Sequence, residues 1–163
     1  MQAPDTDNLS KLYALIKDIK FAMLTTVDAQ GHLRSRPMGT MEAEQDGHIW
    51  FFTALDSAKV EELRREHRVN LSYAAPHDNR YVSVSGVARL VDDRQKIHAL
   101  WNSSGKLFFA GPDDPRLGLL RVTPSEAEYW SSSSTWIGQA IDFVRARITG
   151  DTSKLGENEK IKL

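Results

Sequence analysis

The chain has 163 residues and a mass of 18.4 kDa, which is the size of one ordinary domain. Its 21 lysine and arginine residues nearly balance 22 aspartate and glutamate residues, so the net charge of −1 gives no strong attraction to nucleic acid or an anionic membrane. The chain contains no cysteine, which excludes disulfides, zinc–thiolate sites, iron–sulfur ligation and cysteine nucleophiles.

Targeting signals are absent from the sequence pattern. Residues 1–20 lack the basic segment, apolar block and small-residue cleavage site of a signal peptide. No segment approaches the run of about 18 apolar residues that a membrane helix needs. We therefore expect a cytoplasmic protein that contacts neither membrane nor nucleic acid.

Hydrophobic periodicity predicts the elements in chain order. Leu9, Leu12 and Ile16 recur at three- and four-residue spacing, which is typical of an amphipathic helix over residues 8–19. Alternating or apolar runs bounded by turn residues predict the strands. The expected strands cover residues 21–27, 32–45, 48–54, 69–76, 81–91 and 117–130, and the further helices cover 57–68, 92–102 and 137–148.

Two of these strands carry a positional signal. Pro37 cannot donate a ladder hydrogen bond, so strand 32–45 should lie at an edge or carry a bulge. Strand 48–54 is apolar on both faces, which predicts a central position. Hairpin-linked strands with helices inserted between them favour a closed antiparallel barrel with peripheral helices, a mainly β fold. We place this domain at residues 1–150 and a polar C-terminal tail at 151–163.

Lys59 is the most informative local feature. Ser57 is a good N-cap for the helix that follows, so Lys59 lies in the first helical turn, where the helix dipole disfavours a cation. An anion at the helix start, such as a phosphate, would explain that placement. The alternative is a solvated lysine balanced by Glu61 and Glu62.

A second group of cations lies on strand 32–45. Arg34 and Arg36 share one strand face because side chains alternate with a period of two. A guanidinium suits bidentate phosphate contact, although two surface arginines on an edge strand are the simpler interpretation. If the phosphate hypothesis holds, Arg36 and Lys59 act on one phosphate from two elements.

Other chemical signals are weak. None of the five histidines pairs with another at a metal-ligand spacing, so we expect no metal site. The sequence has no G-x-S-x-G, no Walker A loop and no G-x-G-x-x-G. Trp101, Phe108 and Phe109 form either a satellite core or a stacking wall for a planar ligand or partner subunit.

Several blocks of the sequence together resemble one family. They are RSRPM (34–38), HIWFFTALDSAKVEEL (48–63), YVSVSG (81–86), GPDDPRLGLLRVTPSEAEYW (111–130) and GENEKIKL (156–163). These blocks are similar to the general stress protein 26 family, which belongs to the pyridoxamine 5′-phosphate oxidase-like, FMN-binding split-barrel superfamily. The resemblance covers nearly the whole chain.

The resemblance implies a homodimer of six-stranded antiparallel split β-barrels, with FMN in each of two clefts at the interface. By the family's pattern Arg36 faces the ribityl-phosphate, Pro37 and Met38 line the flavin, and Tyr81 contacts the ring system. Trp101 and the segment 107–109 would come from the other protomer. The cofactor-binding residues that the resemblance implies are Arg36, Pro37, Met38, Thr53, Ser57, Ala58, Lys59, Tyr81, Trp101 and Phe108.

The sequence also departs from the family's pattern. Ala58 stands where the oxidase has a second basic residue, and the oxidase's C-terminal substrate-binding pattern is not evident, which argues against oxidation of pyridoxamine phosphate. Leu107 replaces a tryptophan in the run before GPDDP.

The resemblance leads us to expect a stress-type FMN-binding dimer, either a flavin-dependent oxidoreductase of unassigned substrate or a non-enzymatic protein that sequesters or senses flavin. A third alternative keeps the fold with a deazaflavin or haem. The sequence assigns no catalytic acid or base.

Overall fold

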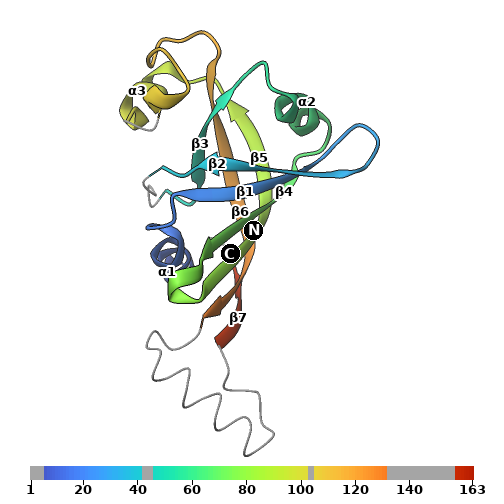
Figure 1. The fold of residues 1–163 in the computed structure, drawn as a ribbon, viewed down its shortest axis with the longest axis vertical. Coiled ribbons are helices and arrows are strands. Elements are labelled where there is room, and N and C mark those ends of the chain that lie inside the picture. The colour runs from blue at the N-terminus through green and yellow to red at the C-terminus, as the bar shows by residue number, and fades with distance from the viewer. Residues whose placement is uncertain (1–5, 42–45, 103–104, 132–156) are drawn as a thin grey trace, which may run out of the picture.

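A computed structural model describes residues 6–41, 46–102, 105–131 and 157–163. Figure 1 shows a curved antiparallel sheet with helices around it. The helices are α1 (Thr6–Ile16), α2 (Ala58–Arg65) and α3 (Arg94–Leu100), with short 3₁₀ turns at Pro76–Asp78 and Gly105–Leu107. The strands are β1 (Phe21–Val27), β2 (Leu33–Gly39), β3 (Ile49–Ala54), β4 (Arg68–Ala75), β5 (Arg80–Val91), β6 (Leu117–Ser131) and β7 (Glu157–Lys162).

The sheet is an antiparallel barrel that stays open. The strand order is β2-β1-β4-β5-β6-β3, and β7 pairs with the far half of β6. In the described part of the chain β2 pairs only with β1 and β3 only with β6, so no ladder joins the two end strands. The closed barrel predicted from the pattern is therefore wrong, and the split barrel implied by the resemblance is confirmed.

The two end strands test the positional predictions. Pro37 lies on β2, at one edge of the sheet, as its missing N–H required. Strand β3 is not central, because it ends the strand order on the other side. Its two faces are buried for a different reason: Phe51 enters the main core, whereas Trp50 packs with Ile97 of α3 in a second cluster. Both faces of β3 are therefore buried because α3 covers the second face, and not because a strand lies on either side of β3.

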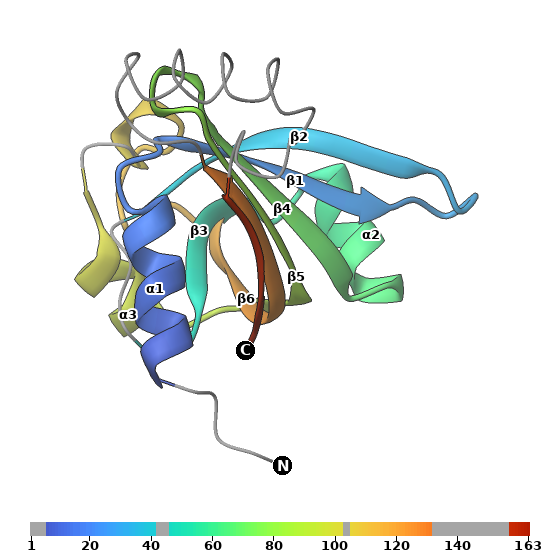
Figure 2. The same cartoon turned by 90° about the horizontal axis from the view of Figure 1, so that it is seen from below.

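The main core lies inside the curved sheet and under α1. Leu12, Tyr13 and Ile16 of α1 pack against buried strand residues such as Leu24 and Leu71. Fully burying one such aliphatic side chain contributes about 1.5–3 kcal/mol to stability. The view from below shows α1 lying along the sheet, on the side away from α2 (Figure 2). No helix within the described ranges combines the length and apolar character that crossing a bilayer requires.

The C-terminal end differs from the predicted polar tail. Residues Glu157–Lys162 form β7, and Ile161 is buried against β6. Glu159 accepts hydrogen bonds from Lys11 at 2.7 Å and from the Tyr129 hydroxyl at 2.9 Å. Composition hid this strand, because one inward apolar residue among charged neighbours is a weak signal. The helix predicted over 137–148 and the boundary at residue 150 lie outside the described residues.

Candidate functional site

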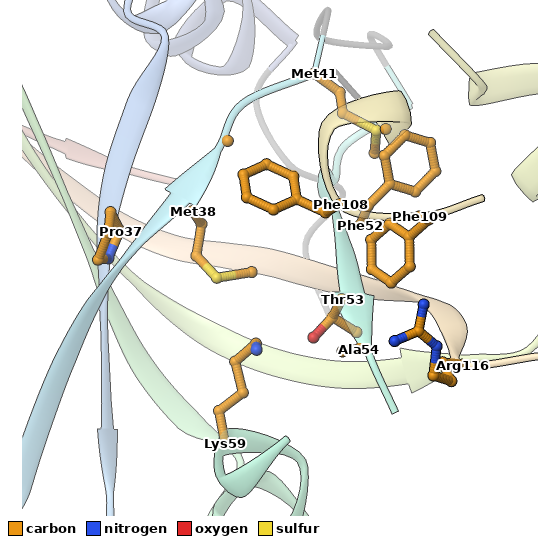
Figure 3. A pocket seen from close by; sticks show the side chains of 12 residues that line it. Pro37, Met38, Met41, Phe52, Thr53, Ala54, Lys59, Phe108, Phe109 and Arg116 are labelled. Atoms are coloured by element: carbon orange, nitrogen blue, oxygen red, sulfur yellow. The ribbon is translucent and has the colours of Figure 1, made fainter. Parts of the chain in front are cut away.

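A cleft of about 310 Å³ lies between the two end strands of the sheet (Figure 3). Its size is at the lower end of the range of about 300–1,000 Å³ typical of small-molecule sites. The side chains come from the end of β2, from β3, from the start of α2 and from the segment after α3. The lining residues are Pro37, Met38, Gly39, Met41, Phe52, Thr53, Ala54, Lys59, Gly105, Phe108, Phe109 and Arg116.

Lys59 projects into this cleft from the first turn of α2. Its ammonium donates to the Ser57 hydroxyl at 2.9 Å, and that hydroxyl donates to the Ala54 carbonyl at 2.6 Å. Ser57 occupies the N-cap position as predicted, but its side chain makes no capping hydrogen bond. The Val60 N–H donates to the Ser57 carbonyl at 3.0 Å, whereas the two N–H groups before it lie too early in the chain to reach an acceptor within the helix, so this helix start offers donors beside a cation.

The charge of Lys59 is poorly compensated. Burial lowers the pKa of Lys59, and the nearby Arg36 guanidinium lowers it further. Glu61 pairs with Arg64 and Glu62 with Arg36, and within the described residues no carboxylate forms an ion pair with Lys59. The Glu62 and Asp56 carboxylates counter this lowering of the pKa without forming an ion pair with Lys59, so a bound anion would add compensation that the fold leaves incomplete.

Thr53 provides a second polar group in the cleft. Its side chain lies on β3, only 2% of the residue is exposed, and its hydroxyl has no hydrogen-bond partner among the residues that the structure describes. Figure 3 shows the hydroxyl oxygen directed toward the side of the cleft that holds Lys59. Buried hydroxyls normally have a partner, so this one is explained by a ligand that donates or accepts a hydrogen bond.

Aromatic and methionine side chains form the opposite part of the cleft. Phe52, Phe108, Phe109, Met38 and Met41 line it, and Figure 3 shows the three phenyl rings gathered on one side. Phe108 is 67% exposed, whereas Phe109 packs against the second core cluster. Such a surface suits a flat aromatic ring.

Trp101 supports this wall without lining the cleft. Its ring lies 5.6 Å from that of Phe52, between centroids, and belongs to the second cluster. A Cβ at Gly105 would come within 2.6 Å of the Trp101 ring, so only glycine fits there. The satellite-core interpretation therefore holds for Trp101, whereas Phe108 lies exposed on the wall of the cleft and its stacking role stays a prediction.

Arg116 is a lining residue that the sequence analysis missed. Its guanidinium is held by Asp114 through hydrogen bonds of 2.9 and 3.2 Å. This guanidinium is the main cause that holds the pKa of the Asp114 carboxyl well below its usual range. The block GPDDPR carried the signal, because Asp114 also accepts from the Ala110 and Arg116 N–H groups and so shapes the loop.

Arg36 does not line the cleft. Its guanidinium lies 2.7 Å from a Glu62 oxygen and also donates to the Thr26 hydroxyl, which itself donates to Glu62 at 2.5 Å. This ion pair fastens β2 to α2, and the predicted contact of Arg36 with a phosphate stays a prediction.

The other predicted residues fall in two groups. Pro37, Met38, Thr53, Lys59 and Phe108 come together around the cleft. Ala58 is exposed on α2 and Tyr81 is 43% exposed on the outer face of β5, and neither lines it. Gly39, Met41 and Phe52 also line the cleft and were not predicted, because only the fold brings them to this edge. Phe108 and Phe109, which the resemblance assigned to the other protomer, line the same cleft as Lys59 of this chain.

Comparisons with known proteins agree with this architecture. Residues 7–154 match the family described as pyridoxamine 5′-phosphate oxidase like. The chain belongs to this family. Protein bli-3 of Neurospora crassa is 29% identical over 171 residues, which cover 98% of this chain and 82% of that protein.

Two solved structures extend this family assignment. The general stress FMN/FAD binding protein of Xanthomonas citri is 30% identical, covers 80% of this chain and 93% of its own, and superposes with a TM-score of 0.66. General stress protein 26 of Bacillus anthracis is 22% identical over 76% of this chain and 92% of its own, with a TM-score of 0.65. The resemblance of this oxidase-like chain to general stress proteins is confirmed.

The cleft fits the flavin that this oxidase-like family suggests. An apolar wall faces one part of it, and the Lys59 ammonium and the buried Thr53 hydroxyl, which has no partner among the described residues, face another. Among the residues with described positions, no group of three or more His, Asp or Glu could hold a metal ion.

Proposed function

We propose that this chain binds FMN in the cleft between β2 and β3. Lys59 and the first turn of α2 hold the phosphate, Thr53 hydrogen-bonds the cofactor, and the rings of Phe52 and Phe108 flank the isoalloxazine. The observation that carries the proposal is found in the described part of the chain: the half-buried Lys59 forms no ion pair, and the same cleft holds a buried Thr53 hydroxyl without a hydrogen-bond partner. The FMN/FAD-binding name of the Xanthomonas citri relative supports the same ligand.

The protein's own contribution to chemistry is binding and orientation. The charged residues that line the cleft are Lys59 and Arg116, and no His, Asp or Glu is among the described lining residues. Bound FMN would supply the electron-transfer chemistry. The side chains therefore fix the ring, exclude water from one face and balance the phosphate charge, which suits a flavin-dependent oxidoreductase without a protein acid or base.

A second copy of the chain is part of the proposal. Met23, Tyr81 and Trp130 are 41%, 43% and 41% exposed on the outer face of the sheet, and Tyr81 lies directly opposite Trp130 in the β5–β6 pair. Large apolar side chains grouped on one face are typical of an interaction surface. A homodimer through this face would cover them, and any contact of Tyr81 with flavin would be to the partner's cofactor.

The cofactor proposal is tested on the purified full-length protein. We expect a yellow protein with the visible spectrum of oxidised flavin, and after removal of the ligand we expect FMN to bind at least about tenfold more tightly than riboflavin because of the phosphate. Equal affinity for the two flavins would remove the phosphate site. Oxidation of NADH or NADPH by the FMN-loaded protein would separate an oxidoreductase from a non-enzymatic flavin binder.

The dimer is tested by light scattering on the same protein. Wild type should elute as a dimer, and Tyr81→Glu combined with Trp130→Glu should give a monomer. Ala14→Glu, on the exposed side of α1, is the matched control and should stay dimeric. A wild-type monomer at micromolar concentration would contradict this part of the proposal.

A further inference from the structure

A second hollow of about 510 Å³ adjoins the flavin cleft. It lies between the segment joining α1 to β1, the end of β2 and the turn after α3. The two cavities share Gly39, Met41 and Phe108. A molecule in the second hollow would therefore lie across Phe108 and Met41 from the ring side of the first cleft.

The rim of this hollow is tied together by hydrogen bonds. The Thr40 hydroxyl donates to the Ile19 carbonyl at 2.6 Å, and the Thr40 N–H donates to the Lys20 carbonyl at 3.0 Å. These bonds join the segment before β1 to the segment after β2. The hollow is thus built into the fold, as ligand sites usually are.

One part of the wall of the second hollow is apolar. Ile19 is buried, and Phe21, Leu107 and Phe108 leave 59%, 78% and 67% of their surface exposed around it. Exposed apolar side chains gathered around one hollow point to an apolar or aromatic occupant rather than to water.

The charge at the rim is positive. Lys17, Asp18 and Lys20 line the hollow, but the Asp18 carboxylate is held by Arg80 at 2.6 and 2.7 Å. Neither lysine forms an ion pair with a carboxylate in the part of the chain that the structure describes. The one acidic group is therefore neutralised, and two lysine cations remain beside an apolar wall.

We propose that the second hollow binds a small aromatic acid, with its ring on Phe21 and Leu107 and its anionic group at Lys17 and Lys20. The inference deepens the proposed function, because it names the class of molecule that binds beside the flavin. Binding itself does not require the flavin, so the two proposals can fail separately.

The first test uses two probes that differ in charge. Calorimetry on the full-length protein, with and without FMN, measures the affinities of 2-naphthoate and 2-naphthamide. Exposed charge pairs are individually weak, so we expect 2-naphthoate to bind about five-fold more tightly. Lys17→Gln with Lys20→Gln should abolish this difference. The control, Lys160→Gln with Lys162→Gln on β7, should keep it. Equal affinity of the probes for wild type, or an unchanged preference in the Lys17/Lys20 variant, would overturn the inference.

The second test places the ligand. Leu107 lines only the second hollow, and its exposure makes Leu107→Glu tolerable for the fold. This variant should weaken 2-naphthoate about tenfold and leave FMN affinity within about two-fold. Competition between 2-naphthoate and FMN would place the acid in the first cleft and overturn the inference. Loss of 2-naphthoate binding when the protein dimerises would show that a second copy fills the hollow, and it would overturn the inference as well. Failure of FMN binding with 2-naphthoate binding intact would overturn only the proposed function.

Discussion

Two neighbouring cations near α2 have opposite surroundings. Arg36 on β2 is bonded to Glu62 and Thr26, so its charge is neutralised within the fold. Lys59 on α2 faces the cleft, the Ser57 hydroxyl is its one hydrogen-bond partner among the described residues, and burial lowers its pKa. The sequence marks both residues as phosphate ligands. The difference teaches that the partner of a cation, and not the presence of the cation, decides whether it is available to a ligand.

Lys59→Met should give the largest effect, a loss of FMN affinity. The variant keeps the apolar stem and removes the charge, so FMN affinity should fall by about 1.5–3 kcal/mol, the range for a hydrogen bond to a charged group. The melting temperature of the flavin-free protein should rise slightly, because a desolvated cation at the positive end of a helix dipole is removed. Fluorescence titration and thermal melts measure both effects. Lys106→Met, an exposed lysine on the neighbouring turn, is the control.

Arg36→Met should mainly lower the stability of the flavin-free protein, whereas Lys59→Met mainly lowers FMN affinity. The flavin-free protein should lose about 1–3 kcal/mol, because Glu62 becomes a largely buried carboxylate without its partner. Adding Glu62→Met should recover most of that loss, since removing both partners of a buried pair is often nearly neutral. Urea unfolding of the two variants measures this. A loss of FMN affinity larger than in Lys59→Met, with stability unchanged, would restore Arg36 as the phosphate ligand.

Thr53→Val separates the buried hydroxyl from the charge. The two side chains have nearly the same shape, so FMN affinity should fall by about 0.5–1.5 kcal/mol, the contribution of one hydrogen bond. Stability of the flavin-free protein should not fall, because the hydroxyl has no partner there. Thr25→Val on β1 is the control. An FMN affinity equal to wild type would show that Thr53 does not contact the ligand.

The pH dependence gives the smallest effect. The pKa of Lys59 is lowered from 10.5 in the folded, flavin-free protein. Between that lowered pKa and 10.5 the unfolded chain binds one more proton than the folded chain, so stability of the flavin-free protein should rise with pH in this window. FMN affinity should fall over the same window, by at most about tenfold per pH unit. Lys59→Met should show neither trend in this window.

The sequence predicted most of the sheet because its strands alternate regularly between buried and exposed residues. Strand β1 was predicted at its observed bounds, and the start of α2 after Ser57 was predicted to one residue. Lys59 was found because its position conflicts with the helix dipole. Such local signals survive without knowledge of the fold.

The missed features depend on contacts between distant segments. Arg36 and Glu62 are 26 residues apart, so their pairing is invisible to strand periodicity. Arg116 and Phe52 reach the cleft only because β3 pairs with β6 at the open edge of the sheet. The edge position of β3 was missed for the same reason, since helix α3 buries its second face.

The most direct test of the account compares the FMN-over-riboflavin preference of wild type with that of Lys59→Met. The preference isolates the phosphate, because ring contacts are common to both flavins. The account predicts a preference of at least about tenfold in wild type that falls close to one in the variant. The same preference in both proteins would show that the phosphate binds elsewhere and would contradict the assignment of this cleft.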